Sequence, residues 1–229
     1  MKGSVMVKDY YADVLHGEAL ETCYALASPR IQQYLKAEIN FVQQKINGMQ
    51  VVLELGCGYG RVLTQLNPYV NMLVGIDTSI HTLLYGKKFL SSCENIHFAA
   101  MDAGTLGLAS GQVDAVICIQ NGISVFRVDS HTLVREVVRV TRPGGVLLFS
   151  TYAPQFWTHR LEWFRLQAEA GLIGEIDEAR TKNGVIVCKD GFKATTFSPQ
   201  SLLKLFSSKV TAAQIIEIDQ SSIFLYAEV

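Results

Sequence analysis

The stretch "VVLELGCGYGR", residues 51–61, decides the fold. An apolar run ends in three glycines that alternate with other residues, and a helical pattern, "GRVLTQL", follows at once. Glycine adds no side chain and tolerates left-handed backbone conformations, so a glycine-rich turn lets a ligand approach the backbone closely. We therefore expect a ligand site over this loop, at the carboxyl end of a strand.

The same alternation of strand and helix continues along the chain. Apolar strands separated by helical segments predict a parallel sheet covered by helices on both faces. Residues 142–145, "RPGG", are expected to end a helix and turn into the next strand, because proline and glycine do not continue a helix. The expected strands lie within "MQVVLEL" (49–55), "NMLVGID" (71–77), "NIHFAAM" (95–101), "VDAVICI" (113–119) and "GGVLLFSTY" (144–152).

The two ends of the chain differ from this alternating part. Residues 1–48 predict a helical cap, with a helix start at Ser28-Pro29. Residues 49–229 form the main domain, in which residues 154–197 are an insertion that covers the substrate and contains a small β-hairpin around 189–191. The last two strand segments of the sequence are expected to pair in an antiparallel manner. The fold class is α/β: a Rossmann-like, seven-stranded, mostly parallel sheet with an antiparallel last strand.

Composition excludes several kinds of partner. The 229 residues include 20 basic and 21 acidic ones without a basic run, so no electrostatic footprint for nucleic acid exists and a small-molecule ligand is expected. The five cysteines form no CxxC pair and lie near no histidine cluster, which predicts neither a disulfide framework nor a metal site. No apolar run is long enough for a membrane span or a signal peptide. We expect a cytoplasmic monomer or homodimer.

Two aspartates end the strands that follow the glycine loop. Asp77 comes 21 residues after Gly56, and a carboxylate there can accept hydrogen bonds from both hydroxyls of a ribose. Asp102 ends the third strand, and its carboxylate can accept a hydrogen bond from an exocyclic amine such as that of adenine. The loop and the two carboxylates therefore predict a ligand that contains adenosine.

The spacing of the loop separates two classes of such ligands. A dinucleotide site normally has G-x-G-x-x-G, whereas residues 56–60 here read G-x-G-x-G and residue 61 is arginine. Glu54, two residues before the first glycine, is unfavourable beside a pyrophosphate and favours a cationic ligand. A nicotinamide-dependent oxidoreductase is thus the less favoured interpretation.

"LELGCGYGR" resembles the first motif of class I S-adenosylmethionine-dependent methyltransferases, E/D-x-G-x-G-x-G. "GIDTS", "AAMDA", "VDAVICIQNGI" and "VTRPGGVLLFSTY" are similar to the later motifs of that family, in the family's order, over residues 48–153. The whole resembles the small-molecule enzymes of methyltransferase types 11 and 25. It implies S-adenosyl-L-methionine as cofactor and transfer of its methyl group by in-line displacement.

The resemblance also implies roles for individual residues. The loop would pass under the methionine part of the cofactor, Asp77 would bind the ribose, and Asp102 would face the adenine amine. For Met101 and Asn121, plain core packing and a plain turn are equally good interpretations. The shared motifs assign no catalytic base. The implied cofactor-binding residues are Glu54, Gly56, Cys57, Gly58, Asp77, Thr78, Met101, Asp102, Ala103, Gln120, Asn121 and, closing over the cofactor, Tyr11; the candidate catalytic residues are His159, Asn121 and Tyr152.

The acceptor is less well defined by sequence. "IQNG" after the fourth strand differs from the Asn/Asp-Pro-Pro-aromatic motif of relatives that methylate nucleic-acid amines, which favours an oxygen or nitrogen of a small molecule. The segment "DYYADVL" and the residues Tyr152, Trp157, His159 and Trp163 are expected to surround the acceptor. No cysteine cluster favours arsenite, and no acidic cluster favours aminopropyl transfer. A non-catalytic partner subunit that binds the cofactor remains an alternative.

Overall fold

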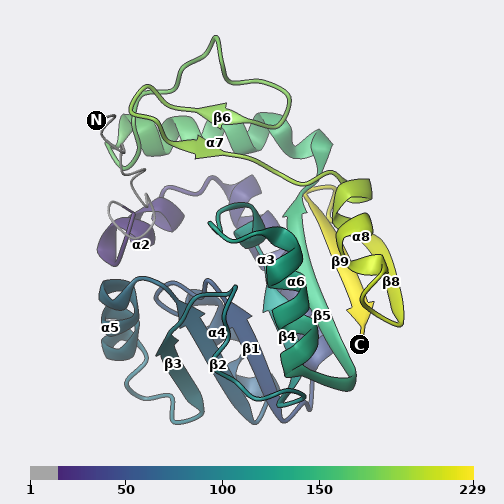
Figure 1. The fold of residues 1–229 in the computed structure, drawn as a ribbon. Coiled ribbons are helices and arrows are strands. Elements are labelled where there is room, and N and C mark those ends of the chain that lie inside the picture. Colours follow the sequence, from purple (N-terminus) through teal and green to yellow (C-terminus); the bar gives the residue numbers. More distant parts are fainter. Residues whose placement is uncertain (1–14) are drawn as a thin grey trace, which may run out of the picture.

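The computed structural model describes residues 15–229, and its centre is one seven-stranded sheet (Figure 1). The strand order is β3-β2-β1-β4-β5-β9-β8. Strands β1 to β5 pair in parallel, and β9 is antiparallel to both of its neighbours. The predicted mostly parallel sheet with an antiparallel last strand is confirmed. The strands are β1 Val51–Leu55, β2 Met72–Asp77, β3 Ile96–Ala100, β4 Val113–Cys118, β5 Thr141–Tyr152, β8 Ala212–Ile218 and β9 Ser222–Glu228.

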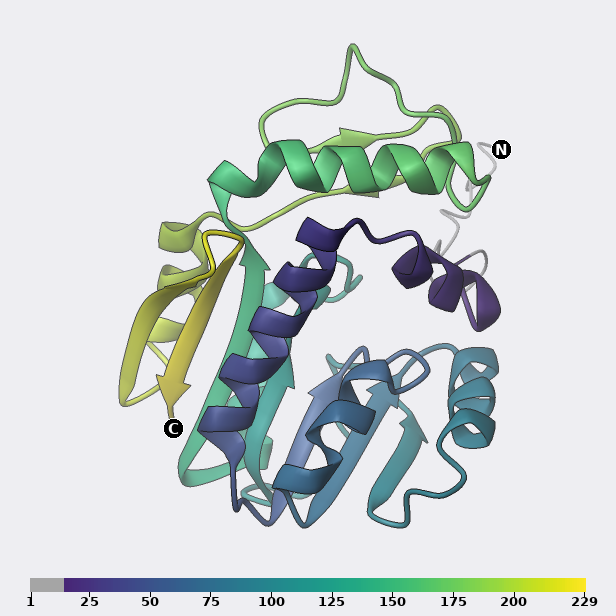
Figure 2. The same ribbon diagram turned by 180° about the vertical axis from the view of Figure 1, so that it is seen from behind.

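Helices cover both faces of this sheet, as expected. On one face lie α3 (Pro29–Ile46), α4 (Arg61–Leu66) and α5 (Ile80–Phe89), which Figure 2 shows in front of the strands. On the other face lie α6 (Ser130–Val140) and α8 (Pro199–Ser207) (Figure 1). Each layer buries its own apolar cluster against the sheet. The boundary at residue 48 stays a prediction, although α3 packs in the same cluster as the strands.

Local sequence explains where these helices begin. The side chain of Ser28 accepts a hydrogen bond from the backbone N–H of Ile31, and Pro29 occupies the first turn of α3. Ser198 caps α8 in the same way. Serine at this position satisfies an N–H that the helix itself leaves without an acceptor, and proline has no N–H to satisfy.

The predicted turn at residues 142–145 takes a different form in the structure. Helix α6 ends at Val140 and β5 begins at once at Thr141, so the four residues lie inside the strand. The pairing with β4 is irregular there, because Val113 pairs with Thr141 but Ala115 pairs with Val146. Proline and glycine therefore produce a bulge at the start of β5 and not a turn before it.

A separate group of elements, the cap, lies above the carboxyl ends of the strands. We define the cap as α2 together with residues 154–197, which include α7 and the short hairpin of β6 and β7. It appears at the top of Figure 1 and has an apolar cluster of its own around Phe164, Ile186 and Phe192. The predicted hairpin is therefore present. The bounds are α2 Glu18–Ala25, α7 Trp157–Glu169, β6 Ile186–Val187 and β7 Lys193–Ala194.

Within residues 15–229 the structure has no membrane-spanning helix, metal-binding cluster or disulfide. No helix within residues 15–229 is both long and apolar enough to cross a lipid bilayer. In the same range, no three His, Cys, Asp or Glu side chains gather closely enough to hold a metal ion. The five cysteines all carry free thiols.

Candidate functional site

A cavity of about 250 Å³ lies between the carboxyl ends of the strands and the cap. Its floor comes from the ends of β1, β2 and β4 and from the loops that follow the strands. Its roof comes from α2 and α7, represented by Tyr24 and Trp163. The cavity is lined by residues 56–59 of the glycine loop and by all of the predicted cofactor residues that the structure describes.

The glycines of the loop are required by their backbone conformations. Gly56 has φ 66° and Gly58 has φ 55°, values that favour glycine strongly. A Cβ on Gly56 would lie 3.0 Å from the ring of Phe126, and one on Gly58 would lie 3.0 Å from Leu20. Side chains at these two positions would enter the cavity, so the loop keeps its floor open to a ligand.

Asp77 connects the loop to the second strand. Its Oδ2 accepts a hydrogen bond from the N–H of Gly58 at 3.0 Å, and its Oδ1 accepts one from the N–H of Ser79 at 2.8 Å. These contacts orient the Asp77 carboxylate at the end of β2, on the wall of the cavity. Thr78, beside it, also lines the cavity.

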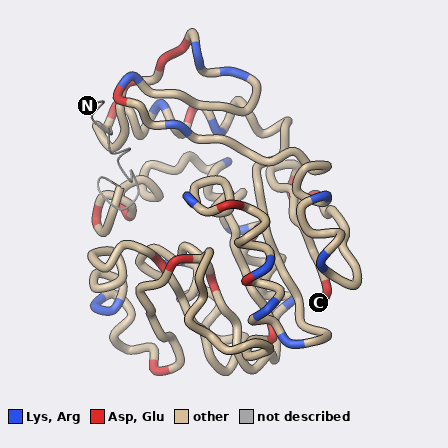
Figure 3. Tube along the Cα trace, in the orientation of Figure 1, with Lys and Arg blue, Asp and Glu red and all other residues tan. Residues whose placement is uncertain are grey.

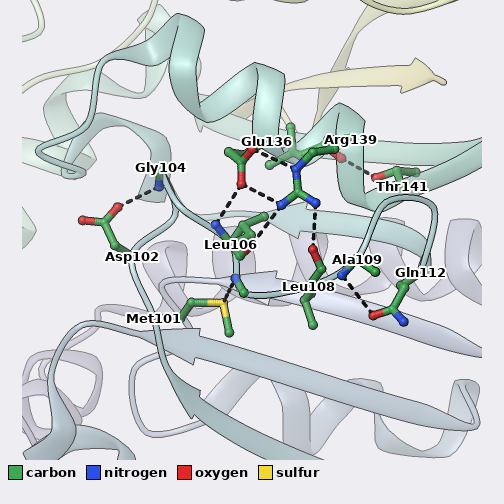
Figure 4. A network of polar contacts seen from close by, with 12 residues as sticks. Met101, Asp102, Gly104, Leu106, Leu108, Ala109, Gln112, Glu136, Arg139 and Thr141 are labelled. Carbon is green, nitrogen blue, oxygen red and sulfur yellow. Dashed lines mark hydrogen bonds and ion pairs between the residues drawn. The ribbon is translucent and has the colours of Figure 1, made fainter.

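The loop after β3 carries Met101, Asp102 and Ala103 to the same cavity. Asp102 is exposed, and its Oδ1 accepts a hydrogen bond from the N–H of Gly104 at 2.7 Å. The sulfur of Met101 accepts one from the N–H of Gly107 at 3.2 Å. Figure 4 shows both contacts at the edge of a larger polar network.

Helix α6 holds this loop through an ion pair. The guanidinium of Arg139 donates to the carbonyls of Leu108 and Leu106, at 2.7 Å and 2.9 Å (Figure 4). Glu136 pairs with Arg139 at 2.8 Å and accepts the N–H of Leu106 at 2.9 Å. The hydrogen bond from Arg139 lowers the pKa of Glu136, because it stabilises the ionised carboxylate. Two charged side chains thereby fix the backbone that presents Asp102.

Glu54 lies at the end of β1 and is only 4% exposed. Burial raises the pKa of Glu54 to about 8; the nearby Arg61 opposes this shift and the carboxylate of Asp77 adds to it. Glu54 Oε2 has no hydrogen-bond partner within residues 15–229. The arrangement favours a ligand whose positive charge would stabilise the ionised form of Glu54.

Arg61 extends this cluster toward the cap. Its guanidinium lies 4.0 Å from the centre of the Tyr24 ring and donates a hydrogen bond to the side-chain oxygen of Gln120. From the sequence, Arg61 stands out only as a departure from the dinucleotide spacing. Its contact with Tyr24 comes from the tertiary placement of α2, which no local pattern predicts.

Gln120 and Asn121 follow β4 with left-handed backbones, φ 56° and φ 66°. The N–H of Gln120 donates to Glu38 Oε2 at 2.8 Å and to Ser150 Oγ at 2.7 Å. Glu38 is fully buried on α3, and burial raises its pKa to about 7. Sequence reasoning did not select Glu38; the available signal was a charged residue within the apolar stripe of α3 that contains Leu35.

The three candidate catalytic residues differ in their surroundings. The amide of Asn121 donates to the carbonyl of Thr195 at 2.9 Å and accepts from Ser124 and Thr151, both at 2.8 Å. Tyr152 lines the cavity, and burial raises its pKa to about 12. His159 does not line the cavity and packs 5.4 Å from the ring of Phe156. Their catalytic roles stay predictions.

Only some of the residues expected to contact the acceptor line the cavity. Tyr152 and Trp163 line the cavity, whereas Trp157 and His159 do not. Tyr10 and Tyr11 lie outside the described residues. Several lining residues had not been selected from sequence because they depend on how the cap folds over the sheet; among them are Tyr24, Arg61, Phe126, Phe164 and Gln167.

Parts of this chain are similar in sequence to known proteins. Residues 52–145 match a family model described as a methyltransferase domain. A malonyl-[acyl-carrier protein] O-methyltransferase of Marinomonas sp. (strain MWYL1) is 34% identical over 113 residues, which is 46% of this chain and 39% of that protein. An arsenite methyltransferase of Aquipseudomonas alcaligenes is 27% identical over 172 residues, 63% of this chain and 49% of that protein. The chain spans about half the length of these curated relatives.

Solved structures share the fold over nearly the whole chain. The PH0226 protein of Pyrococcus horikoshii OT3 has a TM-score of 0.72 at 19% identity, covering 96% of this chain and 98% of that one. The N-methyltransferase NodS of Bradyrhizobium japonicum WM9, solved with S-adenosyl-L-homocysteine, has a TM-score of 0.60 at 13% identity, covering 92% and 97%. At these identities the likeness shows the fold.

Proposed function

We propose that this chain, which belongs to the class I S-adenosylmethionine-dependent methyltransferases, transfers a methyl group to an oxygen or nitrogen of a small molecule. The observation that carries the proposal is the convergence of Glu54, loop residues 56–59, Asp77 and Asp102 on one cavity at three successive strand ends. The family match over residues 52–145 supports the same activity.

The residues present fit the cofactor. Glu54 Oε2, which has no hydrogen-bond partner among the described residues, would face the positively charged methionine part. The open floor over Gly56 and Gly58 leaves room for the ligand beside the backbone. Asp77 would accept hydrogen bonds from the ribose hydroxyls, and Asp102 would accept one from the adenine amine. When bound, the cofactor supplies an activated methyl group: an acceptor lone pair forms the new bond to carbon, the sulfur keeps the electrons of the broken C–S bond, and an acceptor O–H or N–H gives up its proton.

The protein's own part in such a transfer is to align the acceptor and to keep water away. The cap supports this role, because α2 and α7 cover the cavity from the side opposite the sheet. A base is required only for an acceptor that is protonated at the working pH. The side-chain amide of Asn121 is already hydrogen-bonded to Thr195 and Thr151, and Tyr152 has a raised pKa. Both observations favour an acceptor that loses its proton without a catalytic base.

A small acceptor agrees with the surface and the size of the site. Figure 3 shows acidic and basic residues interspersed along the described part of the trace, which favours a small molecule over nucleic acid. Arsenite is less favoured, although Cys23 and Cys57 both line the cavity. Burial raises the pKa of Cys23 to about 12 and that of Cys57 well above its usual value, so neither thiol is ionised at neutral pH. The cytoplasmic location and the state of monomer or homodimer stay predictions.

Calorimetric titration with S-adenosylmethionine, S-adenosylhomocysteine and NAD in parallel tests the proposal. We expect the first two to bind at micromolar concentration and NAD not to bind. Asp77→Ala should weaken binding by about 1–3 kcal/mol, because the ribose hydroxyls lose their acceptor. Glu169→Ala, at an exposed position of α7, is the matched control and should change nothing. Binding of NAD alone would show that the glycine loop serves another cofactor.

A further inference from the structure

Helix α7 buries two polar side chains on the face that it turns toward the sheet. Arg160, Trp163, Phe164 and Gln167 are its buried residues, and their spacing places them on one helical stripe. Trp163, Phe164 and Gln167 line the cavity. The stripe therefore forms part of the roof of the cavity.

The two polar side chains of this stripe differ in their contacts. Arg160 donates to the carbonyl of Gly184 at 2.7 Å, and its guanidinium lies 4.7 Å from the centre of the Tyr152 ring. Gln167 is 5% exposed, and no hydrogen bond joins its side chain to another of residues 15–229. Its amide atoms are not among the fully buried polar atoms that lack a partner, so they reach the open space of the cavity. A ligand in the cavity can hydrogen-bond to them.

The neighbours of Gln167 are aromatic or aliphatic. The Trp163 ring lies 6.0 Å from the Tyr24 ring and 6.3 Å from that of Phe164. The indole N–H of Trp163 is already used, since it donates to the carbonyl of Cys23 at 2.9 Å. Of the α7 side chains that line the cavity, Gln167 alone has a hydrogen-bonding group still available.

Charge divides the cavity into two sides. Its charged lining residues are Glu54, Asp77, Asp102, Arg61 and Arg127, and all come from strand ends, from the loops after them or from the start of α4. The cap side is lined by uncharged residues of α2, α7 and β7 and by Leu15, within the described range. Two cations lie close to the cap side: the guanidinium of Arg61 is 4.0 Å from the centre of the Tyr24 ring, and that of Arg160 is 4.7 Å from the centre of the Tyr152 ring. A cationic acceptor placed there would lose its hydration beside charges of its own sign, which is unfavourable.

We propose that Gln167 selects the acceptor, and that the acceptor is a flat molecule without a positive charge whose carbonyl or hydroxyl group hydrogen-bonds to the Gln167 amide. The aromatic side chains of Tyr24, Trp163 and Phe164 contact its apolar surface. The inference rests on the proposed methyltransferase function, because it assigns the cap side of the cavity to the methyl acceptor.

Titration calorimetry with two probes tests this inference in the presence of saturating S-adenosylhomocysteine. The probes share one ring and differ in charge: 4-hydroxyacetophenone is neutral and tyramine is a cation. We expect the neutral probe to bind about tenfold more tightly than the cation. Gln167→Leu should weaken the neutral probe about tenfold, equivalent to about 1.4 kcal/mol, and should leave S-adenosylhomocysteine binding unchanged. Gln200→Leu, at an exposed glutamine of α8, is the control.

Thermal unfolding of Gln167→Leu separates a ligand contact from a structural one. Because the Gln167 amide bonds to no other described residue, replacing it by an apolar side chain of similar size should leave the melting temperature unchanged. A fall of several degrees, equal binding of the neutral probe to both proteins, tighter binding of the cationic probe, or no binding of the neutral probe at millimolar concentration would each overturn the proposal. Absence of S-adenosylhomocysteine binding would instead contradict the proposed function, and titration of the probes without it would still report on Gln167.

Discussion

The carboxylate of Glu38, on α3, accepts a hydrogen bond from the backbone N–H of Gln120, with 2.8 Å between Oε2 and N. Ser222 of β9 donates to the other oxygen of the same carboxylate. A single buried acid thus connects a helix on one face of the sheet, the last strand and the loop that lines the cavity. Its protonation therefore affects both stability and the geometry of the site.

Glu38→Gln should reduce the dependence of stability on pH. Burial raises the pKa of Glu38 from its usual 4.5 to about 7, so the folded state binds this proton more tightly than the unfolded state does. The contribution of Glu38 to the free energy of unfolding therefore falls as the pH rises from about 4.5 to about 7, by an amount on the order of 1–3 kcal/mol. Urea unfolding across this range measures it. An unchanged slope in the variant would contradict the assignment; Glu54, whose pKa is also raised, contributes a slope of the same sign in both proteins.

S-adenosylmethionine binding should release a proton from Glu54. In the free protein the pKa of Glu54 is raised to about 8, so most of the carboxyl is protonated at neutral pH. A cationic ligand beside it lowers that pKa, and affinity should increase as the pH rises from about 7 to about 8.5. Calorimetry in buffers of different ionisation enthalpy counts the protons. Glu54→Gln should bind more weakly and release none; equal proton release by both proteins would place the titrating group elsewhere.

Arg139→Leu should loosen the loop that carries Asp102. The change removes hydrogen bonds to the carbonyls of Leu106 and Leu108 and leaves Glu136 without its ion-pair partner. We expect the free energy of unfolding to fall by about 1–3 kcal/mol and cofactor affinity to fall several-fold. Denaturant titration and calorimetry measure the two effects. Arg135→Leu, an exposed change on the same helix, should alter neither, and equal losses in the two variants would argue against a specific role for Arg139.

Gly56→Ala should harm the site more than a backbone effect alone explains. Gly56 has φ 66°, and a Cβ there would lie 3.0 Å from the ring of Phe126. Gly171 is the matched control, since it has φ 72° with no atom within 4 Å of an added Cβ. Both substitutions should cost about 1–2 kcal/mol of backbone strain, whereas Gly56→Ala alone should weaken cofactor binding. Adding Phe126→Leu should restore part of that binding; a complete absence of rescue would exclude the steric explanation.

The sequence predicts those parts of the fold that depend on local patterns. The alternation around residues 51–152 predicts the parallel sheet, and Ser28 marks a helix start that the structure confirms. Glu38 and Gln167 escaped prediction because their roles depend on which helix face meets the sheet or the cavity. A polar residue in an apolar stripe indicates burial, but its partner comes from elements far along the chain. The irregular pairing at residues 142–145 is likewise a property of two strands and not of one segment.

β9 lies between β5 and β8, and Val146 pairs with Glu228 across a long intervening segment. Residues 154–197 of the cap belong to that segment. The entropic cost of closing a loop rises only with the logarithm of its length, by about 0.6 kcal/mol for each doubling. Insertions and deletions in the cap should therefore be tolerated while the sheet stays intact. Evolution can in this way exchange the roof of the cavity for another one and keep the strand ends beneath it.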